Sequence, residues 1–260
     1  NPFYLTQVIR LLRGGTQGSL THAADLDLAR EAGVRSVILQ RLSRLPPHCR
    51  RWLDAAAVSG REFTGLFVGE VVDLAPALAE EALGEALEAR MVLPVETTPA
   101  RYRFSHSLIR EVLYNELPVQ QRAQHHARAA AALERAHADD LEPYVARLAS
   151  HYSAAASVGC ADQAVDYSVR AGLAAAARFA WEDAGAHLQR ALSLLELLPA
   201  GSDRRRPDYV VRLYEDLGDV CRMTAEADRA VEAFQKAEAR IPSEESVRRA
   251  RLKRKQVEPL

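Results

Sequence analysis

The chain has 260 residues, of which 48% are hydrophobic and 27% charged, the composition of a folded globular protein with one large or two ordinary domains. Its formal net charge of −1 excludes a global field that would draw it to nucleic acid or to an anionic membrane. Its longest stretch without Asp, Glu, Lys or Arg, residues 148–161, is shorter than the roughly 20 residues of a membrane-spanning helix. The first residues lack a signal-peptide pattern and the three cysteines are widely spaced, so we expect a cytoplasmic protein without a membrane partner.

Lysine is scarce, because Lys236, Lys253 and Lys255 are the only lysines among the 34 basic residues. None of the three follows a glycine, whereas a P-loop has a lysine directly after a glycine to hold the β- and γ-phosphates. We therefore expect that the chain lacks a P-loop. It also lacks the motifs H-E-x-x-H, C-x-x-C and G-x-S-x-G, so we expect that it is not an enzyme by itself, with no catalytic residue and no metal site. The first residue is Asn1 rather than Met, and we expect the chain to be part of a longer polypeptide.

Up to Pro118, hydrophobic periodicity and the positions of Pro and Gly predict short helical elements over residues 2–12, 34–45, 47–59, 67–74 and 76–90. The pattern then changes to two strand-like runs, 91–96 and 101–104, whose turn-forming connection predicts a β-hairpin. Ser105 is expected to cap a last helix that runs to Leu117. Helices followed by a hairpin are typical of a winged helix, which we expect over residues 34–118; the alternative is a small helical domain with an exposed loop.

The second part of the chain is rich in alanine, with 32 alanines after residue 120 against 14 before it. Two sets of four residues recur 46 positions apart with spacings of 12, 4 and 3: Gly172, Ala184, Leu188 and Ala191, then Gly218, Ala230, Phe234 and Ala237. This pattern resembles the tetratricopeptide repeat, in which paired helices bury their apolar faces by stacking on neighbouring pairs. The sequence therefore predicts an all-α fold with one small β-hairpin: a winged-helix domain followed by a tetratricopeptide-like α-solenoid, truncated, over residues 119–260.

The segment from Arg103 to Tyr114 contains the strongest candidate for a functional site, an anion-binding helix N-terminus. His106 and Arg110 are four residues apart, so they share a helix face near the predicted helix N-terminus. Free N–H groups and the helix dipole favour an anion at such a terminus, and the two side chains would support one. The alternative is a solvated face with no ligand.

The same segment, SHSLIRE at residues 105–111, resembles the end of the winged-helix domain of STAND ATPases, the signal-transduction ATPases with numerous domains. NPFYL at residues 1–5 resembles the motif that ends the helical lid of their ATPase module, which we expect over residues 1–14. The resemblance covers nearly the whole chain, and it departs from relatives at Ser107, where they have an Asp. It implies that His106 contacts the β-phosphate of bound ADP and that Asn1 and Pro2 lie by the nucleotide, with Arg110 supporting the anion.

The resemblance also implies the function: the regulatory and protein-interaction portion of a nucleotide-switched ATPase. No cofactor is expected in this chain, whereas the intact protein would hold ATP or ADP with Mg²⁺ in an upstream NTPase core of the same polypeptide. The repeats would receive a protein or a small-molecule ligand, and the output domain of relatives is a LuxR-type DNA-binding domain or a nucleotide cyclase. Two alternatives remain: an interaction scaffold with no nucleotide role, or part of a transcriptional regulator whose DNA-binding domain lies outside this chain.

Several other features favour structural roles. Residues 79–90, at the position of a recognition helix, carry four glutamates against one arginine, so direct DNA binding is not expected. The basic runs 204–206 and 248–255 are interpreted as a solvated loop and a solvated helix face. The adjacent His125 and His126 point about 100° apart on a helix and cannot chelate one metal together, and Trp52 and Trp181 are expected in the core.

Overall fold

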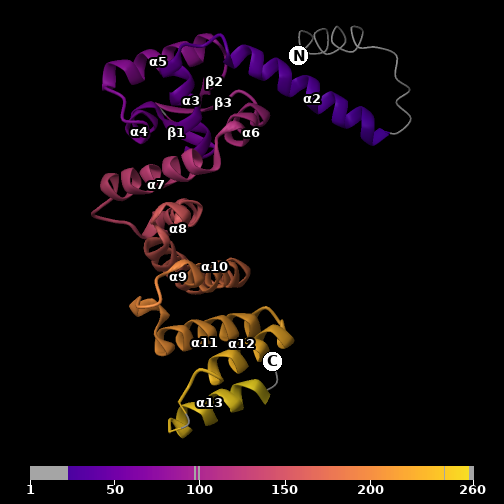
Figure 1. The fold of residues 1–260 in the computed structure, drawn as a ribbon, viewed down its shortest axis with the longest axis vertical. Helices are drawn as coiled ribbons and strands as arrows, with labels where there is room; N and C mark the ends of the chain where they lie inside the picture. The colour runs from indigo at the N-terminus through magenta and orange to yellow at the C-terminus, as the bar shows by residue number, and fades with distance from the viewer. Residues whose placement is uncertain (1–22, 97, 99, 243, 258–260) are drawn as a thin grey trace. The chain divides into compact units, whose positions relative to one another are not determined.

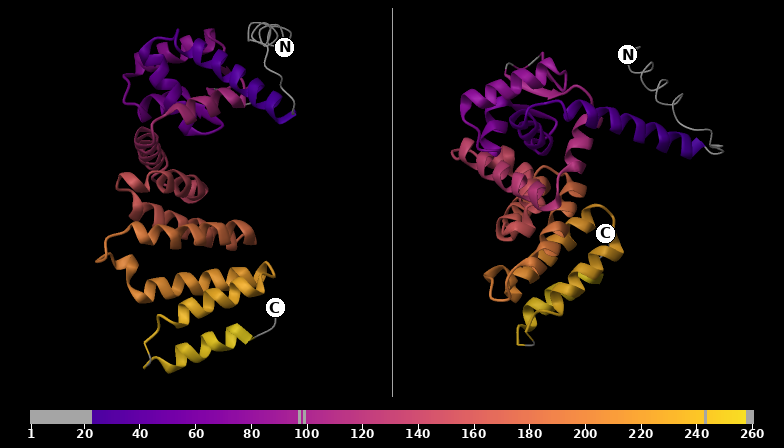
Figure 2. Two further views of the ribbon diagram at one scale, coloured as in Figure 1. Left: turned by 45° about the vertical axis from the view of Figure 1, so that its right-hand side comes forward. Right: turned by 45° about the horizontal axis from the view of Figure 1, so that its top comes forward.

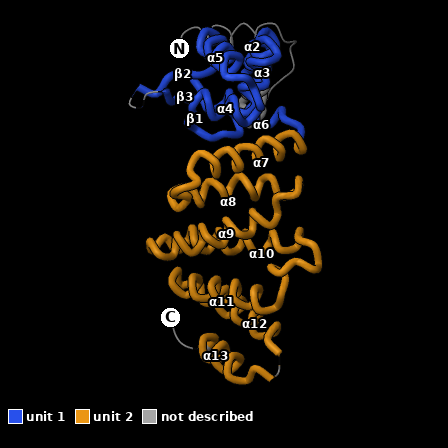
Figure 3. The backbone as a smooth tube through the Cα atoms, turned by 90° about the vertical axis from the view of Figure 1, so that its left-hand side faces the viewer, with its two compact units in different colours: residues 1–118 blue, residues 119–260 orange. Residues whose placement is uncertain are grey.

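The computed structural model describes residues 23–96, 98, 100–242 and 244–257, and the helix expected over 2–12 lies outside them, as do Asn1 and Pro2. The described chain is mostly helical, with one three-stranded antiparallel sheet (Figure 1). It divides into two compact units, Asn1–Pro118 and Val119–Leu260 (Figure 3). Among the described helices, none combines the length and the apolar character needed to cross a bilayer.

Within its described residues, the first unit combines five helices with the sheet. Its elements are α2 (Ala23–Leu42), α3 (Pro47–Ser59), β1 (Glu62–Thr64), α4 (Gly65–Val71), α5 (Pro76–Glu88), β2 (Val92–Pro94), β3 (Arg101–Phe104) and α6 (Ser107–Glu116). Pro47 and Pro76 are the first residues of α3 and α5, where the missing N–H of proline costs no helical hydrogen bond. Gly60, at φ +126°, ends α3 in a conformation that side chains rarely adopt.

The core of the first unit lies between α3 and the sheet. Trp52 is fully buried and its ring meets Phe63 edge-on at 5.7 Å between centroids, while Phe63 meets Phe104 in the same way at 5.6 Å. Phe63 comes from β1 and Phe104 from β3, so this aromatic row joins the helix to two neighbouring strands. Edge-to-face contacts of this kind add to the burial of the rings themselves.

The predicted hairpin is present, because β2 and β3 pair antiparallel. It is part of a three-stranded sheet in the order β1-β3-β2, since β1, which the sequence did not predict, pairs with β3. Two other predictions in this unit were wrong. Helix α2 begins at Ala23 instead of residue 34. Residues 23–33, which the prediction left out of the helix, are rich in the helix formers Ala and Leu. The residue that caps α6 is His106 and not Ser105, whose hydroxyl instead donates to the carbonyl of Arg90 at 2.7 Å.

The second unit is a stack of helices in which each α-helix packs against the next (Figure 2). Its α-helices are α7 (Val119–Ala136), α8 (Val145–Ala154), α9 (Ala161–Ala176), α10 (Trp181–Leu194), α11 (Pro207–Met223), α12 (Ala227–Glu238) and α13 (Ser246–Val257). Short 3-10 turns lie between them at η1 (Glu142–Tyr144), η2 (Ala156–Val158), η3 (Leu195–Leu197) and η4 (Asp203–Arg205).

The residues of the 46-residue repeat lie at two corresponding helix interfaces, α9 with α10 and α11 with α12, and all eight are buried. A Cβ on Gly172 would lie 2.9 Å from Cγ of Leu188, and a Cβ on Gly218 would lie 2.5 Å from Cε1 of Phe234. Each glycine therefore allows a large side chain of the partner helix to lie directly on the backbone. The spacing in the sequence corresponds to a repeated packing arrangement in space.

Candidate functional site

His106 lies at the N-terminus of α6, where its side chain is exposed. Its Nδ1 accepts a hydrogen bond from the backbone N–H of Leu108 at 3.2 Å. Because Nδ1 acts as the acceptor, a neutral His106 carries its proton on Nε2. Within the described part of the chain Nε2 has no hydrogen-bond partner, so the ring offers an N–H donor to a ligand beside the first turn of α6.

The Arg110 side chain, unlike that of His106, forms a hydrogen bond to another helix. Its Nε donates to the carbonyl oxygen of Ala57 in α3 at 2.9 Å, and its guanidinium lies 5.9 Å from the ring centroid of Tyr114. The hydrogen bond to Ala57 joins α6 to the last turn of α3, whereas the contact with Tyr114 lies within α6. His106 bonds to its own helix and Arg110 to α3, so the two side chains have separate sets of contacts.

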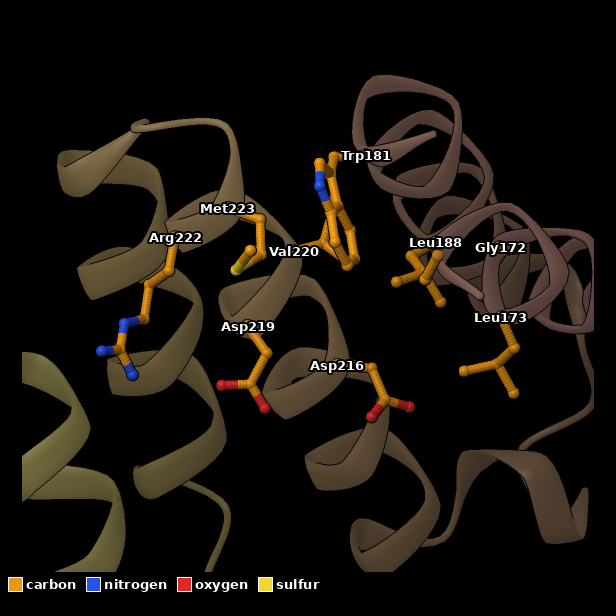
Figure 4. A pocket seen from close by; sticks show the side chains of 10 residues that line it. Gly172, Leu173, Trp181, Leu188, Asp216, Asp219, Val220, Arg222 and Met223 are labelled. Atoms are coloured by element: carbon orange, nitrogen blue, oxygen red, sulfur yellow. The ribbon is translucent and has the colours of Figure 1, made fainter. Parts of the chain in front are cut away.

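Sequence reasoning missed a cavity in the second unit. It has a volume of about 520 Å³ and lies between the α9–α10 pair and α11. In Figure 4, Leu173, Trp181 and Leu188 line it from the first pair, and residues of α11 line it from the other side. The full lining is Gly172, Leu173, Ala176, Trp181, Leu188, Asp216, Asp219, Val220, Arg222 and Met223.

Apolar side chains dominate this cavity and several are open to solvent. Leu173 is 44% exposed and Met223 is 58% exposed, unusual values for large apolar residues that face one another across a cavity. Trp181, expected in the core, is only half-buried, and its ring meets the ring of the exposed Phe179 edge-on at 5.7 Å. Trp181 also borders a second cavity of about 220 Å³, formed with Cys221, Thr224 and Glu226. Exposed apolar surface of this kind marks ligand and partner sites.

The charged groups of the cavity of about 520 Å³ are two carboxylates, Asp216 and Asp219, and the guanidinium of Arg222, all from α11. Asp219 accepts a hydrogen bond from Nζ of Lys255 at 2.7 Å, so a cation of the chain already neutralises it. Asp216 makes no hydrogen bond or ion pair within the described residues. Burial raises the pKa of Asp216 above its usual value, and the neighbouring Asp219 adds to the rise while Arg212 opposes it. This half-buried, unpaired carboxyl group favours a ligand that brings a cationic or hydrogen-bond-donating group to the apolar wall.

The basic runs were expected to be solvated, and this is confirmed for only part of each run. Arg205 and Arg206 are exposed, as are Arg251, Lys253 and Arg254, and less exposed members of the runs form ion pairs with neighbouring helices. Arg204 bridges Asp162 at 3.2 Å and Asp166 at 3.1 Å, and so ties its loop to α9. Arg248 pairs with Asp208 and with Glu215, both of α11. Acidic side chains on neighbouring helices thus attract these basic residues, and the cationic helix α13 serves to hold the stack together.

Two buried histidines, His126 and His151, form a contact that the sequence did not predict. Nδ1 of His126 in α7 lies 2.9 Å from Nδ1 of His151 in α8, and both rings are 7% exposed. Only one proton fits between two nitrogen atoms at that distance, so one ring donates to the other. The partner lies 25 residues away along the chain, and therefore local spacing gives no sign of it.

Searches against protein-family models, curated proteins and solved structures found no match to this chain.

Proposed function

We propose that this chain is the regulatory and interaction portion of a nucleotide-switched signal-transduction ATPase of the STAND class. One observation carries the proposal: the last helix of the first unit begins at an exposed His106 whose Nε2 has no hydrogen-bond partner among the described residues between 23 and 257, as expected for a phosphate sensor. Two further features support it. The chain continues directly into a stack of paired helices, and the stack has a repeated interface.

The first unit is assigned as a winged helix in this proposal. Helices α3 and α5 pack on one another, and the antiparallel sheet β1-β3-β2 includes the hairpin of β2 and β3, whose strands are joined by residues 95–100. The second unit is assigned as tetratricopeptide-like, because a glycine on the first helix of each pair receives a large side chain from the second. Helix α13 is the first helix of a further pair.

The proposed mechanism is a population shift. The upstream NTPase core of the same polypeptide holds ATP or ADP with Mg²⁺, and Asn1 and Pro2 lie beside the nucleotide. His106 contacts the β-phosphate of ADP through Nε2, with the N-terminal N–H groups of α6 nearby, and favours a closed state. A ligand or partner on the helical stack favours the open state. Direct DNA binding is not part of the proposal, because Glu80, Glu81 and Glu88 of α5 are exposed and would repel phosphate.

The test is calorimetric titration of ADP into the protein extended by its upstream segment. His106→Ala is expected to weaken binding by tenfold or more, about 1.4 kcal/mol. His106→Asn separates two roles of the residue, because Asn still accepts from the Leu108 N–H as a helix cap but does not reach as far as an imidazole. His137→Ala, a histidine of the other unit, is the matched control.

Three outcomes are informative. If both His106 variants lose affinity and the control does not, the phosphate-sensing role stands. If only His106→Ala loses affinity, the residue acts through the helix cap. If ADP fails to bind, or binds all variants equally, the nucleotide role is wrong.

A second candidate function is an interaction scaffold with no nucleotide role, favoured by the cavity beside Trp181. That cavity is complete within α9, α10 and α11 and needs no upstream core. In this case the first unit would be a packing module, and the output, including a DNA-binding domain of a transcriptional regulator, would lie elsewhere. Failure of ADP to bind in the experiment above, with both units folded, favours this function.

A further inference from the structure

Three side chains that commonly bind metals meet in the first unit. His48, Glu81 and Glu85 each offer one ligand atom, and the three atoms all lie within 4.8 Å of one another. Glu81 and Glu85 are one helical turn apart, so both carboxylates rise from the same face of α5. His48 is the second residue of α3 and reaches the cluster from the neighbouring helix.

The backbone around this cluster is held by contacts that do not involve its ligand atoms. Ala82 and Ala86 of α5 are fully buried, and the thiol of Cys49 donates to the carbonyl oxygen of Ala82 at 3.4 Å. This hydrogen bond engages the thiol in the packing of α3 against α5, and the imidazole and the two carboxylates form the ligand set.

The geometry of His48 and Glu85 is unusual for an ordinary ion pair. Nε2 of His48 and Oε2 of Glu85 lie 3.1 Å apart, and both atoms are shielded from solvent. Despite this proximity they are not aligned for a hydrogen bond, and neither has another partner in the described chain. Shielded polar atoms without a partner are costly. Two ligands of one tetrahedral zinc ion are separated by about 3.3 Å when the bonds are about 2.05 Å long.

We propose that His48, Glu81 and Glu85 form a binding site for a divalent first-row transition metal, with Zn²⁺ as the probe. One imidazole nitrogen and two carboxylate oxygens suit Zn²⁺, whereas Mg²⁺ and Ca²⁺ prefer oxygen ligands alone. Glu81 is exposed, so the fourth position is open to water. The bound ion links α3 to α5. Motif reasoning found no metal site, because His48 lies more than 30 residues before the two glutamates and the three residues follow no known spacing.

The test uses the full chain, freed of metal with a chelator and titrated with ZnCl₂ in a calorimeter. One equivalent is expected to bind. His48→Gln and Glu85→Gln are each expected to weaken the binding by about 100-fold or more, since even residues outside the ligand shell change metal affinity by about 10–100-fold. Glu80→Gln, an exposed neighbour on the same helix, is the matched control and should bind as the unmodified chain does.

Far-UV circular dichroism checks that each variant is folded. If His48→Gln does not fold, Glu81→Gln replaces it, because Glu81 is exposed and its substitution leaves the core intact. A second measurement is thermal unfolding: Zn²⁺ should raise the Tm of the first unit in the unmodified chain and in Glu80→Gln, but not in the site variants. Absence of binding at 100 μM Zn²⁺ overturns the proposal, and so does binding that the site variants leave unchanged.

Discussion

The buried pair of His126 and His151 shows how one residue makes the stability of the second unit depend on pH. Burial lowers the pKa of His151 from the usual 6.5 to about 3, and the charges of His126 and Arg147 add to this effect. The folded state thus holds His151 neutral, while the unfolded chain binds a proton below about pH 6.5. Stability is therefore fully present above pH 6.5 and falls as the pH drops toward 3.

We predict that the free energy of unfolding of the second unit decreases between pH 6.5 and 5, by up to about 1.4 kcal/mol per pH unit for this one proton. His151→Gln removes the titrating ring but keeps a side chain that hydrogen-bonds to His126. Urea unfolding at several pH values should show a shallower pH dependence in the variant. Equal slopes for the two proteins would mean that His151 is not the group responsible.

At this scale the sequence shows residue types but not the partners of each residue. His125 and His126 are visible as a pair in the sequence, yet the contact that matters joins His126 to the distant His151. The cap of α6 was assigned to Ser105 because serine is a common cap. In the structure the Ser105 hydroxyl donates to the carbonyl of Arg90, and His106 caps the helix by accepting from the N–H of Leu108. Trp181 was expected in the core from its apolar neighbours, but it borders a cavity that only the packing of α11 creates.

Among the elements, the helix pairs of the second unit depend on close approach at two glycines. A Cβ on Gly218 would lie 2.5, 2.7 and 2.8 Å from three ring atoms of Phe234, a residue with no exposed surface. The ring has no space to move into, so the helices themselves would have to separate. Gly185 in α10 provides a contrast, because a Cβ there would lie 3.5 Å from Cγ1 of Val220, an ordinary contact.

We predict that Gly218→Ala destabilises the second unit by about 1–3 kcal/mol, the usual cost of overpacking a core. Gly185→Ala should be neutral or stabilising by up to about 1 kcal/mol, since alanine is the better helix former. The two variants make the same chemical change at helical positions, and urea unfolding followed by circular dichroism compares them. Equal effects would show that helix propensity, and not contact with Phe234, decides the outcome.

The elements that the sequence predicted well are those with strong local signals. Helix α3 spans the residues expected for it, because Pro47 fixes its start and Gly60 its end. Strand β1 was missed because it has three residues, too few for an alternating pattern, and it forms only by pairing with β3. The role of α13 was missed because its basic side chains are matched by acids on α11 and α12, which only the stacking of helices places opposite them.

In the whole molecule, each unit has its own core and its own tryptophan. Trp52 is fully buried in the first unit, and Trp181 lies in the second, and the chain has no other tryptophan. The boundary between the units falls between Pro118 and Val119. Large fully buried side chains, such as Leu53 in one unit and Phe234 in the other, belong to separate cores, so each unit has the means to fold as a cooperative unit.

We therefore predict that the two units unfold in separate transitions. In a Trp181→Phe background, tryptophan fluorescence reports the first unit alone, while circular dichroism reports both. Adding Gly218→Ala should move the circular-dichroism transition of the second unit to lower urea concentration, because the overpacked core lies there. The fluorescence midpoint of Trp52 should stay unchanged, since Trp52 packs on Phe63 within the core of the first unit. If both midpoints shift together, the units unfold as one cooperative structure, and a ligand on the helical stack would then alter the stability of the first unit through the fold itself.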